Sequence, residues 1–212
     1  KGNFEESFKK LESIKSVKNL ADDVSSELQL LVIDIVNSAI LDNKQESYAE
    51  ASKKLYLAYN IENEGEDYLY YAASSSINAA DWKTALKYYI ELKELNYKGV
   101  VTKYYVTKLD TGEKLEVDSM EYELFKKLPK EYSDFIEEET ESKFPEIVKN
   151  IALIYNQLGM KDEAMAAVSE ARKSNPEDAN LIIVEANLYI ELDEKDKFKE
   201  LIKEAIRLKP ND

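Results

Sequence analysis

Two short patterns in this sequence contain residue types that could do chemistry. Asp110-Thr111-Gly112 matches the tripeptide in which aspartic proteases present a carboxylate, and the segment from Glu131 to Glu141 carries six acidic residues and no basic one. Aspartic-protease chemistry needs two aspartates that share a proton. Only one copy of the tripeptide occurs, so we interpret it as a turn between strands. The acidic segment lacks the spaced Asp/Asn and Gly of an EF-hand loop. We interpret it as a solvated linker, with attraction of a basic partner as the alternative.

The composition excludes most other chemistry. The 212 residues contain neither cysteine nor histidine, which rules out Cys/His zinc sites, disulfides, cysteine nucleophiles and histidine-dependent triads. No Walker A or GxGxxG motif occurs, and a net charge of −14 repels phosphate backbones. An enzyme built only from Asp, Glu, Lys, Tyr or Ser remains conceivable, but no motif supports it. We therefore predict no enzyme activity, no cofactor, no metal site and no nucleic-acid binding.

The same composition favours a helical protein with a core. Hydrophobic residues make up 44 % of the chain, whereas there are only 5 glycines and 4 prolines, and this scarcity favours long uninterrupted helices. The most apolar segment, from Leu28 to Leu41, is interrupted by polar residues. It therefore predicts no transmembrane segment.

A period of 34 residues runs through the sequence. Pro176 and Pro210 are separated by that distance (210 − 176 = 34), and the same shift places Ala152 on Ala186. A mainly apolar quartet spaced 3, 4 and 3, which is one face of a helix, recurs in five segments. These begin at Phe4, Tyr48, Trp82, Lys161 and Lys195.

The repeat predicts pairs of helices with short turns between them. Small residues such as Ala152 lie where two helices approach each other. Gly159 supplies the left-handed residue of one turn, Pro176 is expected at the first position of a helix, and Ser47-x-x-Glu50 predicts a capping box. The expected helices span residues 3–15, 24–41, 46–59, 65–79, 81–96, 144–158, 160–174, 177–191 and 194–208.

Helix pairs with this period, small residues at their contact, an aromatic residue after the turn and a proline at the repeat end resemble the tetratricopeptide repeat (TPR). Glu185, Asp193 and Phe198 depart from its pattern. The resemblance implies an all-α, TPR-type helical-hairpin solenoid that winds into a right-handed superhelix. The opening Lys1-Gly2-Asn3-Phe4 resembles a turn before the second helix of a pair, so we expect the natural protein to extend further toward its N-terminus.

One insertion interrupts the repeat. Ala85 and Ala164 occupy the same repeat position but lie 79 residues apart (164 − 85), which leaves 45 residues beyond one period (79 − 34), at about 99–143. Alternating, β-branched stretches at 100–107 and 114–118 predict a β-hairpin. A short helix is expected from Ser119 to about Leu128, before Pro129 and the acidic linker.

The predicted organisation is one continuous solenoid domain. It has N-terminal TPR-like pairs at 1–98 with an incomplete first repeat, the insertion at 99–143 and C-terminal pairs at 144–212. Because two strands alone are marginal in water, we expect the hairpin to pack against the solenoid or to pair with a partner strand.

The resemblance also implies a function. In TPR folds the first helix of each pair lines a groove, and the Lys/Asn pairs of the chaperone-binding carboxylate clamp are incomplete here. We predict a non-catalytic scaffold or adaptor that binds a protein or peptide through the groove and the insertion. The alternative is a structural subunit of a larger envelope or cytoplasmic assembly. A weaker resemblance to envelope-associated bacterial TPR proteins favours the periplasm or cell envelope. The positions implied to line the groove are Tyr70, Ser74, Ile77, Asn78, Lys149, Leu153, Asn156, Gln157, Ile183, Asn187, Ile190 and Glu191.

Overall fold

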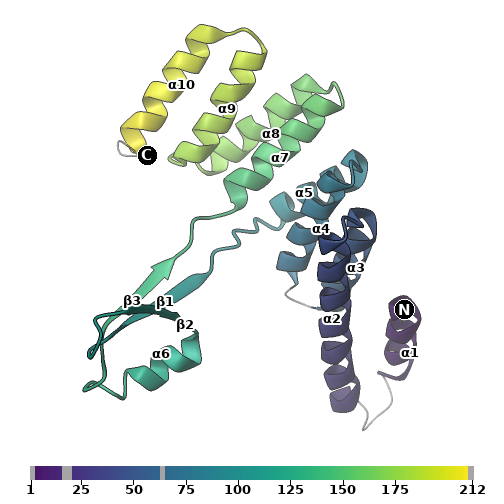
Figure 1. Cartoon of the computed structure of the whole chain (residues 1–212). Helices are drawn as coiled ribbons and strands as arrows, with labels where there is room; N and C mark the ends of the chain where they lie inside the picture. Colours follow the sequence, from purple (N-terminus) through teal and green to yellow (C-terminus); the bar gives the residue numbers. More distant parts are fainter. Residues whose placement is uncertain (1–2, 16–20, 63–64, 210–212) are drawn as a thin grey trace. The chain divides into compact units, whose positions relative to one another are not determined.

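The chain divides into two units. A computed structural model describes residues 3–15, 21–62 and 65–209. The first unit is formed by the segments Lys1–Tyr97 and Phe144–Asp212, and the second unit is the inserted segment Lys98–Lys143. Helices make up the first unit, and a small sheet with one helix makes up the second (Figure 1).

Every helix predicted for the solenoid is present in the first unit. The least accurate prediction is α2, which begins at Ala21 rather than 24 and ends at Lys44 rather than 41. In the described part of this unit the helices are α1 (Phe4–Ile14), α2 (Ala21–Lys44), α3 (Tyr48–Ile61), α4 (Glu66–Asn78), α5 (Trp82–Glu94), α7 (Phe144–Gln157), α8 (Lys161–Ser174), α9 (Ala179–Glu191) and α10 (Lys195–Leu208).

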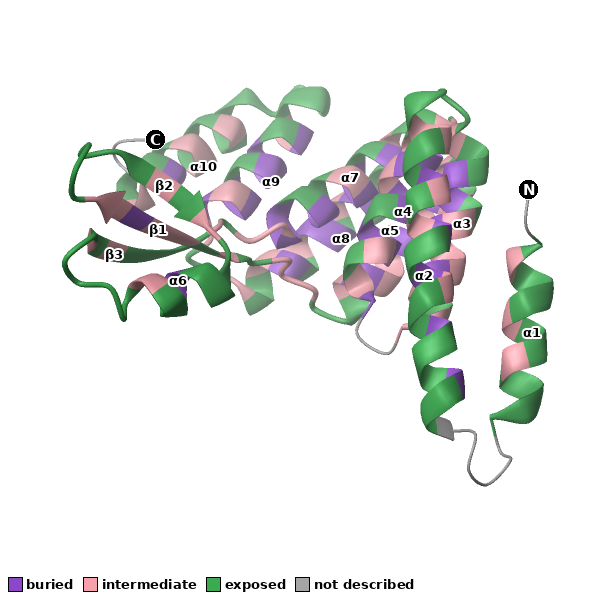
Figure 2. Cartoon of the chain, turned by 60° about the horizontal axis from the view of Figure 1, so that its bottom comes forward, coloured by how far each residue is buried: buried purple, intermediate pink, exposed green. Residues whose placement is uncertain are grey.

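The helices pack in sequential pairs. The pairs are α2 with α3, α4 with α5, α7 with α8, and α9 with α10, and each pair also packs on the next. Ala152 of α7, Ala164 of α8 and Val168 of α8 lie fully buried in one cluster, as the small-residue pattern predicted. Buried residues concentrate on the inward faces of these helices, whereas α1 has none (Figure 2).

The insertion interrupts the chain without interrupting the stacking of helices. Ala85 and Leu92 of α5 share a buried cluster with Ile147, Ile151 and Ile154 of α7. The helices on either side of the insertion therefore pack as neighbouring repeats do.

The repeat is also visible in the backbone of the turns. Glu46 and Ala80 have φ angles of 59° and 56°, and Gly159 and Asp193 have φ angles of 77° and 60°. The spacing within each of these two sets is the repeat period (80 − 46 = 34 and 193 − 159 = 34). Each of these four residues lies in the turn between the two helices of a pair. The left-handed conformation predicted at Gly159 is therefore confirmed, and the other three turns contain a left-handed residue as well.

Two local predictions in the solenoid are wrong. Ser47 precedes α3, but its side chain makes no capping hydrogen bond, and Glu50 instead pairs with Lys53 at 2.8 Å. Pro176 lies in the turn before α9, and Asp178 caps that helix by accepting from the amides of the next residues. Predictions that concern Lys1, Gly2 and Pro210 fall outside the described residues.

The inserted unit contains a three-stranded antiparallel sheet and one helix. The elements are β1 (Thr102–Lys108), β2 (Lys114–Val117), α6 (Ser119–Phe125) and β3 (Tyr132–Glu139), and the strand order is β2-β1-β3. The predicted hairpin and short helix are confirmed. Asp110–Gly112 is the turn of the hairpin, where the Gly112 amide donates to the Lys108 carbonyl at 2.8 Å.

The acidic linker expected before α7 is instead strand β3, so that prediction is wrong. Phe135 packs edge-on against Tyr122 of α6, and Tyr132 stacks on Phe125 with ring centres 4.1 Å apart. These aromatic contacts and the pairing with β1 outweigh the low strand propensity of glutamate. The third strand, which pairs with the predicted hairpin, therefore belongs to the insertion and not to the solenoid or to a partner.

Helix α2 passes a length and composition test for a membrane span over Asp22–Lys44. An apolar core helix of a soluble protein passes the same test. Val24, Val32 and Ile35 of α2 are buried within the first unit, so part of its apolar surface serves the core.

Candidate functional site

A groove of about 470 Å³ lies between the first helices of two consecutive pairs, α2 and α4. Its walls are mainly aliphatic and tyrosine side chains, and its polar groups are amides and hydroxyls. None of its lining residues is charged, in a chain in which charged residues make up 34 %. The lining residues are Val36, Ile40, Asn43, Tyr48, Leu55, Tyr68, Tyr71, Ser74, Ser75 and Asn78.

Helical spacing positions these side chains. Tyr71, Ser74, Ser75 and Asn78 are spaced 3, 1 and 3 along α4, which places them on one face of that helix. Ile40 of α2 and Tyr71 are 45 % and 49 % exposed. They leave apolar surface in the groove accessible to solvent.

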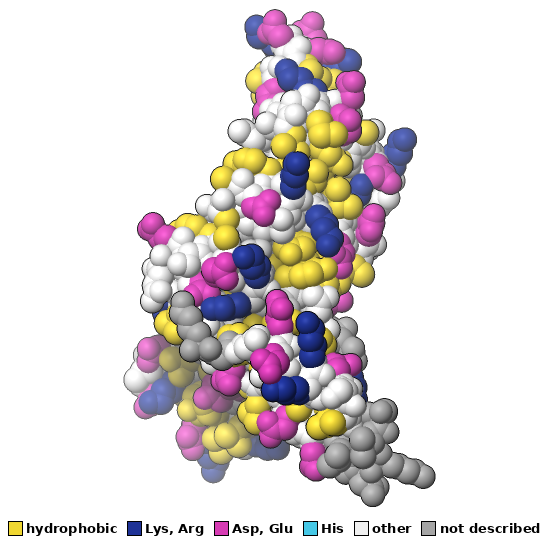
Figure 3. Space-filling view, turned by 90° about the vertical axis from the view of Figure 1, so that its right-hand side faces the viewer, with side chains coloured by type: hydrophobic (Ala, Val, Ile, Leu, Met, Phe, Trp, Pro, Cys, Tyr) yellow, Lys and Arg dark blue, Asp and Glu magenta, His cyan; other side chains and the backbone are white. Residues whose placement is uncertain are grey.

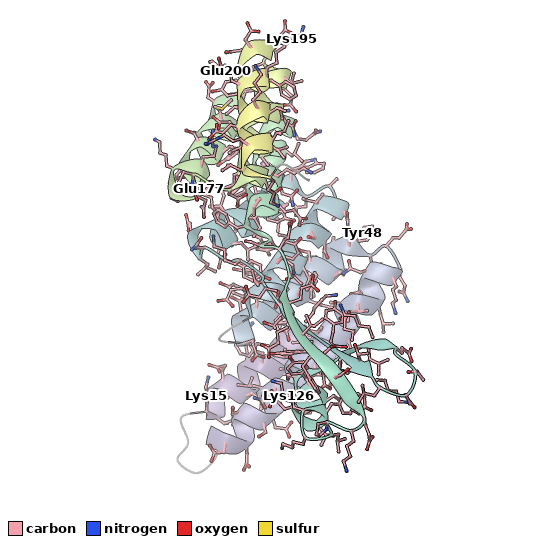
Figure 4. All side chains as sticks on the ribbon, turned by 90° about the vertical axis from the view of Figure 1, so that its left-hand side faces the viewer. Lys15, Tyr48, Lys126, Glu177, Lys195 and Glu200 are labelled. Atoms are coloured by element: carbon pink, nitrogen blue, oxygen red, sulfur yellow. The ribbon has the colours of Figure 1, made fainter. Side chains whose placement is uncertain are left out.

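Helix α3 supplies a further part of the wall. Tyr48 stands at the first position of α3 (labelled in Figure 4), and Leu55 lies two turns further along the same helix. The groove is therefore built by one helix pair, α2 and α3, and by α4, the first helix of the next pair.

Hydrogen bonds fix the polar residues in the groove. Ser75 Oγ donates to Asn43 Oδ1 at 3.1 Å, which links α4 to α2. Ser74 Oγ lies 3.1 Å from the Tyr89 hydroxyl of α5. Asn78 is exposed at the end of α4 and presents both an amide donor and a carbonyl acceptor.

The structure brings together only some of the residues predicted to line a groove. Ser74 and Asn78 line the groove described above. Asn156 donates to Glu191 at 2.5 Å, which links α7 to α9, and Ile77 packs against the core. The remaining predicted positions on α7 and α9 are exposed: Lys149, Leu153, Gln157, Ile183, Asn187 and Ile190.

Tyr70 does not lie in the exposed position expected of it. Its side chain is 8 % exposed and belongs to a core cluster that includes residues of α4, α5 and α7. Burial, and then the hydrogen bond to Glu146, raise the pKa of its hydroxyl well above the usual value. Tyr70 therefore bridges two repeats and is not available to a ligand.

Helix α2 contributes residues to the groove that the sequence did not indicate. Ile40 and Asn43 were not proposed for the groove, although Ile40 lies one period before Ser74 (74 − 40 = 34). Applying the period to the helix at 24–41 would have found it. The sequence analysis places Tyr70 on the groove face, whereas the structure places its neighbour Tyr71 there.

Acidic side chains do not cluster as a metal site in the described part of the chain. No group of three or more Asp or Glu side chains among those residues is placed to hold a metal ion. The lining residues of the groove offer apolar contact and neutral hydrogen bonding.

Comparisons with known proteins agree with this architecture. The family model described as tetratricopeptide repeat matches residues 150–178 and 180–212, which cover α7–α10 apart from the start of α7. A tetratricopeptide repeat protein from Parabacteroides merdae ATCC 43184 is similar in structure, with a TM-score of 0.53 and 13 % identity. The similarity covers 85 % of this chain and 54 % of that one.

A crystal structure of MamA is also similar, with a TM-score of 0.51, 11 % identity and 92 % of each chain covered. No curated protein sequence matches this chain. At these identities the structural likeness establishes the fold alone. The fold is a TPR-type helical solenoid with a small β-sheet insertion, and its C-terminal helix pairs carry the TPR sequence signature.

Proposed function

We propose that this chain is a non-catalytic scaffold or adaptor that binds a protein or peptide through the first helices of its pairs and through the insertion. Repeat arrays present extended surfaces rather than closed pockets, and the TPR fold supports an interaction role in general. The partner class is protein or peptide, because the net charge of −14 disfavours nucleic acid.

The observation that carries this proposal is the uncharged groove between α2 and α4. Tyrosines supply large contact area at low entropic cost, and the amide of Asn78 can pair with a peptide backbone. The absence of charge among the lining residues favours a ligand segment that presents an uncharged apolar side chain. Burying a charged side chain there would cost free energy without a partner to offset it.

The test uses two matched substitutions of asparagine by tryptophan. Asn78→Trp places a bulky ring in the groove at the exposed end of α4, whereas Asn60→Trp places the same ring at an exposed position near the end of α3. Peptides displayed on phage are selected against the unmodified chain, and their affinities for all three proteins are measured by fluorescence anisotropy.

Selected peptides should share an aliphatic or aromatic side chain. Asn78→Trp should weaken their binding by about tenfold or more, because the pocket for that side chain is filled. Asn60→Trp should bind them as the parent does. Equal binding by both variants and the parent would overturn the proposal.

The alternative, a structural subunit of a larger assembly, is favoured by a different surface. Leu30, Ile33 and Leu41 of α2 are each more than half exposed, and such apolar stripes mark interaction sites. One face of the molecule shows hydrophobic patches between charges of both signs (Figure 3). Ile33→Lys should then release the protein from a large complex in size-exclusion of native extracts, and an unchanged elution position would contradict this alternative.

A further inference from the structure

Strand β3 leaves one edge of the inserted sheet without a strand partner. The order β2-β1-β3 makes β3 an outer strand, and no other described strand pairs with it. The Thr140 amide donates to the Val101 carbonyl at 2.9 Å on the β1 side. Because amide directions alternate along a strand, the backbone groups of Glu137 and Glu139 point toward the unpaired edge.

The side chains along this edge are acidic on both faces of the sheet. Glu137 lies opposite Tyr104 on the face that α6 covers, 3.6 Å from Lys126, the residue that follows α6 (labelled in Figure 4). Glu138 and Ile136 lie on the other face, where Ile136 is 42 % exposed. A strand added here would therefore meet acidic side chains on either face and one apolar side chain.

Sheet edges are usually protected against pairing by charged side chains, most often lysine, by proline or by bulges. In β3 the register shifts opposite Tyr105 and Thr107, next to Asp134 with a φ of 48°. This bulge ends the regular part of the edge, which leaves the segment from Ile136 to Glu139. Neither lysine nor proline occurs in that segment.

The charges select the occupant. A second copy of this chain would place glutamates opposite glutamates, and like charges directly opposite each other on neighbouring strands are destabilising. An extended segment rich in lysine or arginine would gain cross-strand ion pairs together with main-chain hydrogen bonds, as in strand addition.

We propose that the edge of β3 binds an extended basic segment of a partner protein by adding it to the sheet as a fourth strand. This inference rests on the proposed role of the insertion in partner binding and specifies the chemistry of that partner. It does not depend on the groove between α2 and α4, so failure at one surface leaves the other testable.

The experiment compares two double variants that lose the same charges. Glu137→Gln with Glu139→Gln keeps both outward-pointing amides, whereas Glu137→Pro with Glu139→Pro removes them. Proline is tolerated on edge strands where its nitrogen faces outward, and circular dichroism checks that both variants fold. The probe is a fluorescein-labelled octapeptide of alternating lysine and valine, measured by anisotropy, with an alternating glutamate and valine octapeptide as control.

The unmodified chain should bind the basic octapeptide and not the acidic one. The glutamine variant should bind it more weakly than the parent, and the proline variant should lose about a further tenfold, because two main-chain hydrogen bonds are gone. Equal affinity of the proline and glutamine variants would show attraction by charge alone and would overturn strand addition. Absence of binding to the unmodified chain would overturn the whole inference.

Discussion

At the scale of single residues, Glu185 shows how a departure from the TPR pattern is accommodated. It occupies an apolar position of the repeat, and its side chain is almost fully buried in α9. Arg172 of α8 donates from Nη1 to Glu185 at 2.5 Å and from Nη2 to Glu204 of α10 at 3.0 Å. A buried carboxylate is tolerated because a guanidinium pairs with it.

This arrangement predicts strong coupling between Arg172 and Glu185. Glu185→Leu keeps the volume but leaves Arg172 with one carboxylate, so the free energy of unfolding should fall by about 3 kcal/mol. The double variant Arg172→Met with Glu185→Leu should recover most of that loss, because Glu204, the carboxylate that then loses Arg172, is 36 % exposed and solvated by water. Urea denaturation measures both, and a double variant no more stable than the single one would contradict the pairing.

At the scale of elements, the turns within helix pairs hold left-handed residues that are not always glycine. Ala80 has a φ of 56° and occupies the same repeat position as Gly159 (159 − 80 = 79, one period plus the insertion). A residue with a Cβ pays about 1 kcal/mol for this conformation. The helix packing on both sides of the turn maintains it nonetheless.

Ala80→Gly should therefore stabilise the protein by about 0.5 kcal/mol, since relief of the backbone strain exceeds the added entropy of the unfolded chain. The reverse change at the equivalent turn, Gly159→Ala, should destabilise it by about 1 kcal/mol. A Cβ at Gly159 would meet no atom within 4 Å, so this loss reports backbone conformation and not a clash. Opposite shifts in the urea midpoint are expected, and shifts of the same sign would refute the explanation.

The elements that the sequence predicted well are those with local signals. The helices have a repeated apolar face and the hairpin of β1 and β2 has alternation around a turn, so both depend on residues close in sequence. Strand β3 depends on pairing with β1 about thirty residues earlier and on packing against α6. Because glutamate has a low strand propensity and is usually exposed to solvent, the residues of this segment alone indicated a linker.

The groove was predicted only in part for a related reason. Its α4 residues follow from helical periodicity, whereas Tyr48 and Leu55 belong to the second helix of a pair and reach the groove through packing. Neighbouring helix residues such as Tyr70 and Tyr71 point in directions about 100° apart. The 34-residue period does not determine which of the two faces the solvent.

At the scale of the whole molecule, the insertion and the solenoid are separable by their contacts. The core of α4, α5 and α7 is continuous without any residue of the inserted unit. Within that unit, the Lys143 amide donates to the Lys98 carbonyl at 2.7 Å, so the two ends of the insertion lie beside each other. A short connection could therefore replace everything between them.

Replacing residues 99–142 by Asn-Gly should leave the solenoid folded, because the two residues would fill the centre of a turn closed by the hydrogen bond from Lys143 to Lys98. Helical ellipticity per residue should rise because the sheet is removed. The melting temperature should stay within about 4 °C of the parent, a shift equivalent to roughly 1 kcal/mol or less. Loss of a cooperative transition would show instead that the insertion supports the solenoid.

The shortened chain should still bind the peptides that the groove selects, and Asn78→Trp should weaken that binding as it does in the full chain. The shortened chain should no longer bind the lysine–valine octapeptide. Loss of both activities in a folded protein would contradict the assignment of two independent binding surfaces.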